Sequence, residues 1–246
     1  MSAFFTRIPY NGLAEFEKFT LTHFVTVIII VLFFIAFFKY ASKLKNWKHE
    51  KVVRYSIVVF MLLSNITIYT YVYNNNLPWY MYLPEATCGW SIYFGSIALV
   101  TKNRFFSVLA IFWGYGAAFS ILGPNILEGP DKYNFYQFFL RHILIVLTGF
   151  YLIKIQDFKL YKKDWKLYFF FTISIVIAGG ILSLVINDPN RLNMFFTMKP
   201  GINGTPLSWI YNKSHLAYVI VWLAFAAFIG YIYALPFYQA RRKHNE

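Results

Sequence analysis

Long apolar runs without charged residues dominate the pattern of this chain. The first, Phe24–Phe38, contains no Lys, Arg, Asp or Glu. A membrane-spanning helix needs about 20 mostly apolar residues, and the runs predict helices near residues 21–39, 53–73, 86–101, 104–123, 136–155, 166–186 and 215–237. We therefore expect an all-α fold: a polytopic membrane bundle of seven transmembrane helices.

The same pattern predicts how the chain is divided. No internal repeat or low-complexity linker interrupts the apolar runs, so we expect one membrane domain over residues 21–238, an external segment over 1–20 and a basic tail over 239–246. Small residues recur at helical spacing, which lets helices approach closely in lipid; examples are Ser91 with Gly95, and Gly230 with Ala234. The outer loop over 187–214 is unusually apolar, and we expect it to lie on the membrane surface or to fold back as a lid.

Composition agrees with a membrane protein and gives its orientation. The chain of 246 residues is 59% apolar and 13% charged, whereas a soluble domain is about a quarter charged. Its net charge of +13 is unevenly distributed, because most Lys and Arg residues fall in segments that share one side of the bundle: 39–54, 102–104, 154–166 and 241–243. Basic loops favour the cytoplasm. This predicts an outside N-terminus and an inside C-terminus, and it explains the charge without nucleic acid.

Three groups suited to chemistry lie near the predicted outer ends of helices: His23, Cys88 and His142. A thiolate in the first turn of a helix is favoured by the free amides and the positive end of the dipole, and an imidazole can take the thiol proton. Each group also has a simpler interpretation. Cys88 is in a small-residue stripe that suggests packing, His142 is equally suited to bonding a carbonyl, and His23 to lying at the interface.

Other polar residues are expected to be structural. Asn65 suits a hydrogen bond between helices, Glu85 suits a position in water, and Arg141 suits contact with lipid headgroups. A single cysteine excludes an internal disulfide and a cysteine-based metal cage, and the chain contains no nucleotide-binding or zinc-protease motif. We therefore expect no cofactor and no metal.

Several short motifs resemble one family of membrane proteins over roughly residues 20–238. The chain is similar to the YwaF-like bacterial integral membrane proteins, which are related to the eukaryotic transmembrane protein 164 family. The motifs are Phe135-Tyr-Gln-Phe-Phe-Leu-Arg-His142, Phe112-Trp-Gly114, Gly123-Pro124-Asn125, Thr22-His23, Leu83-Pro84 with Cys88, and Asn193-Met194-Phe195 with Lys199-Pro200. The resemblance implies a multi-helix protein of the bacterial plasma membrane.

The resemblance also implies acyl transfer on phospholipids, with Cys88 as nucleophile and His142 as base. We expect a lipid acyl ester to enter from the outer leaflet and to acylate the thiol. Membrane lipids are the expected partners, and the oligomeric state is left open. Residues expected to bind substrate are His23, Arg141, Asn193 and Lys199, with Arg141 or Lys199 at the phosphate and Asn193 donating to an oxyanion. Two alternatives stay open: a non-catalytic membrane protein for lipid binding, transport or assembly, and a lipid hydrolase that depends on His142 alone.

Overall fold

The computed structural model is an α-helical bundle and describes residues 3–5, 15–74, 76–187, 192–200 and 206–238. Its helices are α1 (Leu21–Lys45), α2 (Glu50–Asn74), α3 (Thr87–Thr101), α4 (Arg104–Leu122), α5 (Tyr133–Lys154), α6 (Asp164–Ile186), α7 (Pro206–Lys213) and α8 (His215–Ala234). Short 3₁₀ turns cover Ala3–Phe5, Trp79–Tyr82, Met194–Phe196 and Leu235–Phe237. The predicted all-α class is confirmed for the described residues.

Six helices are long and apolar enough to cross a membrane: α1, α2, α4, α5, α6 and α8 with the turn that follows it. The chain is therefore an integral membrane protein. The predicted span over 86–101 corresponds to α3, but at 15 residues this helix rises only about 22 Å, so a seventh crossing of the membrane stays a prediction. The helix begins at Thr87, three residues after Pro84, and it ends at Thr101, before Lys102, whose φ of 55° is left-handed.

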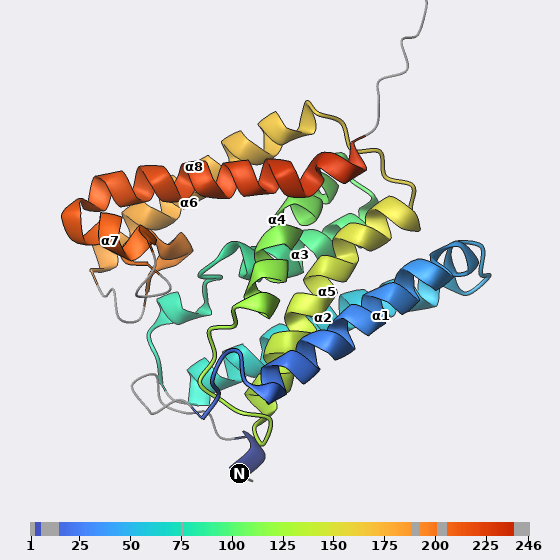
Figure 1. Ribbon diagram of the computed structural model, residues 1–246, viewed down its shortest axis with the longest axis horizontal. Helices are drawn as coiled ribbons and strands as arrows, with labels where there is room; N and C mark the ends of the chain where they lie inside the picture. Colours follow the sequence, from blue (N-terminus) through green and yellow to red (C-terminus); the bar gives the residue numbers. More distant parts are fainter. Residues whose placement is uncertain (1–2, 6–14, 75, 188–191, 201–205, 239–246) are drawn as a thin grey trace, which may run out of the picture.

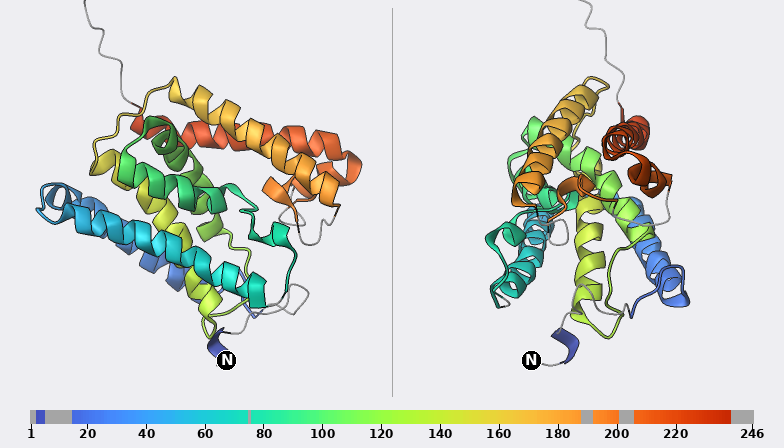
Figure 2. Two further views of the ribbon diagram at one scale, coloured as in Figure 1. Left: turned by 180° about the vertical axis from the view of Figure 1, so that it is seen from behind. Right: turned by 90° about the vertical axis from the view of Figure 1, so that its left-hand side faces the viewer.

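The central helices are α3, α4 and α5, which pack against one another (Figure 1). Helices α1 and α2 lie on one side of them, and α6 and α8 lie on the other (Figure 2). Small residues on the central helices mark close approaches, as predicted. A Cβ atom added to Gly95 of α3 would lie 3.2 Å from Cγ2 of Thr148 on α5, and one added to Gly149 would lie 3.5 Å from Cα of Ile111 on α4.

Two predicted helix ends and one predicted loop differ from the structure. Helix α1 continues past Lys39 to Lys45, because a helix can carry a basic last turn beyond the lipid, where it complements the helix dipole. Helix α8 ends at Ala234, followed by a 3₁₀ turn over Leu235–Phe237, since Pro236 has no N–H for the α-helical ladder. The apolar loop over 187–214 contains a helix that the apolar pattern did not predict, α7.

The described part of that loop folds back onto the bundle. Met194 and Phe195 are buried, and the indole Nε1–H of Trp222 donates to the Phe195 carbonyl at 2.9 Å. The phenol of Tyr218 donates to the Phe196 carbonyl. Of the two predicted arrangements, these residues adopt the folded-back one.

The segments on either side of the membrane domain, 1–20 and 239–246, lie only partly within the described residues. Residues 239–246, and with them the predicted basic tail, lie outside the described part of the chain. In the first segment, Phe16 is buried among core rings, and the N–H groups of Glu15 and Phe16 donate to the Leu127 carbonyl. The segment that precedes α1 therefore packs against the bundle at this point.

Candidate functional site

Cys88 occupies the first turn of α3, as predicted. The helix begins at Thr87 after Ala86, whose backbone is extended. The cysteine is half-buried and is not in a disulfide. The side chains of Thr87 and Ser120 lie next to its thiol, and the Arg141 guanidinium is close enough to act on it electrostatically.

Helices α3 and α5 pack side by side and run in the same direction. A Cβ on Gly89 would lie 3.5 Å from Nη2 of Arg141, and six residues further along α3, Gly95 meets Thr148 of α5. The residue numbers of the contacting pairs increase in both helices from the first contact to the second, so the helices are parallel. The residues next in sequence to the two catalytic candidates, Gly89 beside Cys88 and Arg141 beside His142, therefore lie close together.

His142 is buried, and its ring is fixed from within its own helix. Its Nδ1 atom lies 2.7 Å from the Phe138 carbonyl one turn earlier. A carbonyl only accepts, so Nδ1 carries the hydrogen in the neutral ring and Nε2 keeps its lone pair. The ring also lies 4.2 Å from the Phe138 ring, centroid to centroid. A histidine held in this way can accept a proton at Nε2.

Arg141 is the neighbour that Cys88 and His142 share. Its charge acts on the thiol and also on the imidazole. The guanidinium thus lies within electrostatic range of both groups. A direct contact between Cys88 and His142 stays a prediction.

His23 is engaged at both ring nitrogens. The Phe19 N–H donates to Nδ1 at 3.1 Å, and Nε2 lies 3.0 Å from the Ile121 carbonyl and donates to it. The residue is buried. It therefore fastens the start of α1 to the end of α4, and its predicted role at the substrate is untested.

Asn193 and Lys199 belong to the folded-back loop. The Asn193 amide donates to the Lys199 carbonyl at 2.9 Å, and its side-chain oxygen accepts from the N–H groups of Met198 and Lys199. The Asn193 side chain thus closes a turn of the loop. Its predicted role as an oxyanion donor stays a prediction, as does phosphate binding by Lys199.

Glu85 is exposed, as expected, and it also joins this loop to the start of α3. Its carboxylate accepts the Asn193 N–H at 2.9 Å, and its carbonyl accepts the Phe195 N–H at 2.7 Å. Part of the residue is exposed. Desolvation of the carboxyl nevertheless raises the pKa of Glu85, outweighing the Asn193 hydrogen bond and the Lys199 charge, which lower it.

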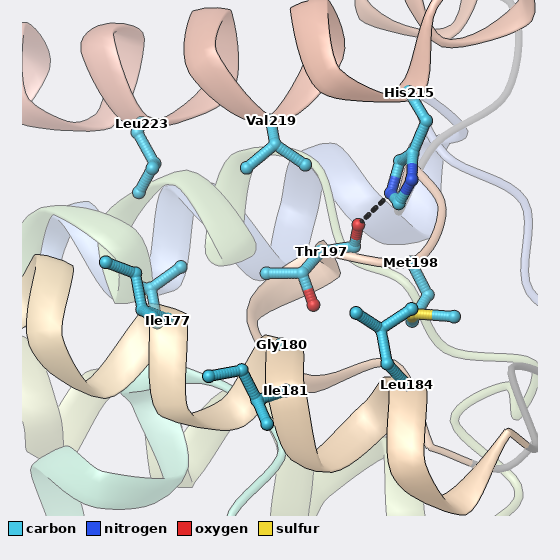
Figure 3. Close-up of a pocket in the computed structure, with 10 residues that line it drawn as sticks. Ile177, Gly180, Ile181, Leu184, Thr197, Met198, His215, Val219 and Leu223 are labelled. Atoms are coloured by element: carbon cyan, nitrogen blue, oxygen red, sulfur yellow. Dashed lines mark hydrogen bonds between the residues drawn. The ribbon is translucent and has the colours of Figure 1, made fainter.

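An apolar groove of about 190 Å³ runs between α6 and α8. Figure 3 shows Val219 and Leu223 reaching down from α8 toward Ile177 and Ile181 of α6. At one end, the His215 ring makes a 2.6 Å hydrogen bond to the Thr197 carbonyl. Because both walls are helices able to span a membrane, the groove suits a fatty chain.

Sequence reasoning overlooked Tyr93 and Ser120, which are neighbours of Arg141 and Cys88 respectively. Ser120 bonds the carbonyl of Gly116 in its own helix, and Tyr93 bonds Tyr69 of α2. A hydroxyl group inside an apolar helix is the sequence signal that would have identified each of them, but many other serines and tyrosines in this chain share that signal.

Comparison with known proteins identifies a family but gives no described relative. No curated protein and no solved structure matches the chain. The model of the TMEM164 family matches residues 18–235, a region that includes all six long apolar helices, the first turn of α3 and the folded-back loop. The relation to the transmembrane protein 164 family is thereby confirmed, while the narrower YwaF-like assignment stays a prediction. The chain belongs to the TMEM164 family.

Proposed function

We propose that this membrane protein is an acyltransferase that acts on phospholipid or other lipid acyl esters through an acyl-thioester on Cys88. The observation that carries the proposal is the approach of α5 to the first turn of α3: a Cβ on Gly89, next to Cys88, would lie 3.5 Å from Nη2 of Arg141, the residue before His142. Parallel packing of α3 and α5, and a His142 ring with its Nε2 lone pair available, support the same pairing.

The proposed reaction proceeds in two steps. His142 Nε2 takes the proton from the Cys88 sulfur, and the sulfur attacks the ester carbonyl carbon. The ester C–O bond breaks, the acyl group stays on sulfur, and the leaving alkoxide takes the proton from the imidazolium. In the second step, an acceptor hydroxyl or amine gives its proton to His142 and attacks the thioester, which restores the thiol.

The orientation of the chain is part of this proposal. Basic loops on one side favour an outside N-terminus and an inside C-terminus, with α3 as a seventh, short membrane helix. Cys88 then lies at the outer end of α3. The substrate enters from the outer leaflet, in a bacterial plasma membrane, and the groove between α6 and α8 offers an apolar surface for one of its chains.

Acyl transfer by the purified protein is the direct test. The protein in detergent receives a phospholipid with a labelled acyl chain and an unlabelled lysophospholipid, and labelled product is measured. Wild type should transfer the chain and carry hydroxylamine-sensitive label on Cys88. Cys88→Ser should lose both the transfer activity and the label, and His142→Ala should transfer the chain at least about 100-fold more slowly than wild type. Full transfer by Cys88→Ser would refute the proposal.

A specific observation favours a second candidate, a lipid-binding protein without catalysis. The lining of the α6–α8 groove includes neither Cys88 nor His142. This candidate predicts that labelled lipid binds equally to wild type and to Cys88→Ser and that no chain is transferred by either. A His142-dependent hydrolase would instead release free fatty acid in the Cys88→Ser variant.

A further inference from the structure

Arg141 differs from the other arginines that the structure describes. Arg54 of α2 pairs with Glu50 at 3.3 Å, and Arg104 of α4 pairs with Asp164. In the described part of the chain, Arg141 has no carboxylate at ion-pair distance. A positive charge inside a membrane bundle is costly unless an anion compensates it.

Two buried nitrogen donors lack partners, one in Arg141 itself and one in Asn65 of α2. Within the described residues, neither Nε of Arg141 nor Nδ2 of Asn65 makes a hydrogen bond. Asn65 is only 5% exposed, so water is largely excluded from it. Buried polar groups are almost always hydrogen-bonded, so an exception calls for an explanation such as a strained site or a missing ligand.

Tyr93 brings these two donors into one cluster. Its hydroxyl neighbours the Asn65 amide, although the amide nitrogen does not reach hydrogen-bond geometry, and the Arg141 charge acts on it. The cluster therefore joins α2, α3 and α5. Its unpartnered atoms are both donors, so the missing partner is an acceptor, and the unpaired guanidinium requires that acceptor to be negative.

The cluster lies beside the candidate nucleophile. The Nη2 atom of Arg141 reaches the first turn of α3 at Gly89, next to Cys88. A guanidinium binds phosphate with two parallel hydrogen bonds. Inside a membrane, a phosphate is brought to such a place by a lipid, whose fatty chains make its entry into the bundle favourable.

We propose that Arg141, Asn65 and Tyr93 form the subsite for the phosphate of a membrane phospholipid. The proposal rests on the proposed function, since it places the lipid headgroup where its acyl ester meets Cys88. It assigns the phosphate to Arg141 rather than to Lys199. It also gives Asn65 a role at the ligand in place of the expected bond between helices.

Thermal unfolding of the delipidated protein in an uncharged detergent tests this subsite. The probes are dioleoyl phosphatidylglycerol, dioleoylglycerol, oleate and inorganic phosphate. The variants are Arg141→Met, Asn65→Leu and, as a matched loss of one positive charge, Lys51→Met at the exposed opposite end of α2.

We expect phosphatidylglycerol to raise the Tm by several degrees, because a ligand that binds only the folded state stabilises it. Dioleoylglycerol should not do so. Arg141→Met should weaken phospholipid binding by about tenfold or more, Asn65→Leu should weaken it less, and Lys51→Met should leave it unchanged. Without lipid, Arg141→Met should be as stable as wild type or more stable, since it removes an unpaired charge.

Five results would overturn the proposal. If dioleoylglycerol raises the Tm as much as phosphatidylglycerol does, the phosphate makes no contact that matters for binding. If Arg141→Met keeps the full shift in Tm, Arg141 does not bind the phosphate. If only oleate raises the Tm, the ligand is a fatty-acid carboxylate. If only inorganic phosphate raises the Tm, the ligand is not a lipid. Arg141→Met that unfolds without lipid would reveal a partner within the chain.

The same measurement on Cys88→Ser separates this inference from the proposed function. If Cys88→Ser keeps the phospholipid shift while wild type transfers no acyl chain, the subsite stands and acyl transfer fails. If wild type transfers acyl chains and Arg141→Met transfers them with unchanged KM, acyl transfer stands and the subsite fails.

Discussion

The carboxylate of Glu85 accepts the backbone N–H of Asn193 at 2.9 Å, across 108 positions of the chain. This bond fixes the folded-back loop to the residue that leads into α3. It therefore connects the loop between α6 and α7 with the turn that carries Cys88. Its dependence on pH follows from the environment of the carboxyl.

Glu85→Gln should remove a dependence of stability on pH. Desolvation raises the pKa of Glu85 in the folded protein above its ordinary value, so protonation favours the folded state. The stabilisation is fully present below the ordinary pKa and is lost as the pH rises through the raised one. Relative to the Gln variant, wild type should become less stable over that interval.

Unfolding of both proteins in detergent from pH 4 to pH 8 measures this difference. Glu17→Gln, at another exposed position near α1, controls for the loss of one negative charge. If wild type instead becomes more stable than Glu85→Gln as the pH rises, the pKa of Glu85 is not raised in the folded protein.

Two adjacent glycines of α6 should respond oppositely to alanine. A Cβ on Gly179 would lie 2.8 Å from two ring carbons of Phe195, whereas a Cβ on Gly180 would meet Thr197 at an ordinary 3.5 Å. Gly179→Ala should therefore destabilise the protein by about 1–3 kcal/mol. Gly180→Ala should stabilise it by about 0.5–1 kcal/mol, because alanine loses less backbone entropy in a helix.

Each glycine variant is the control for the other, since both make the same chemical change in one helix. Denaturant unfolding in mixed micelles gives the two free-energy changes. Equal effects of the two substitutions would show that Phe195 does not pack against Gly179 in the membrane protein.

His23→Ala should destabilise the bundle by about 1–3 kcal/mol. Both ring nitrogens are bonded, to the Phe19 N–H and to the Ile121 carbonyl, and the loss of a buried partner leaves these groups unsatisfied. Thermal unfolding measures the effect, with the exposed His49→Ala as the control. A variant that folds as stably as wild type but fails to bind lipid would instead support His23 as a substrate residue.

Arg104→Met should destabilise the protein by about 1–3 kcal/mol. The Asp164 carboxylate is buried whereas the Arg104 guanidinium is exposed, so the substitution leaves a buried negative charge without its partner. The Arg104→Met, Asp164→Asn double variant should recover part of this loss. Urea or SDS unfolding of the two variants gives the comparison, and additive effects would argue against a coupled pair.

The predicted helices were largely correct because a membrane imposes a strong local rule. Each backbone polar group in lipid must be bonded within its own segment, so an uncharged apolar run of sufficient length is a helix regardless of its neighbours. The same rule does not apply outside the lipid. That is why α7 was overlooked and why the end of α1 was placed too early.

The sequence by itself determined the membrane class, the helix order and the position of Cys88 in the first turn of α3. These depend on local hydrophobicity and on residues close in the chain. Only the tertiary structure decided which partners these residues have: that Arg141 reaches the start of α3, that His142 bonds Phe138, and that Glu85 holds Asn193. Such contacts join distant segments or depend on side-chain direction, and they follow from packing in three dimensions, which the order of residues does not display.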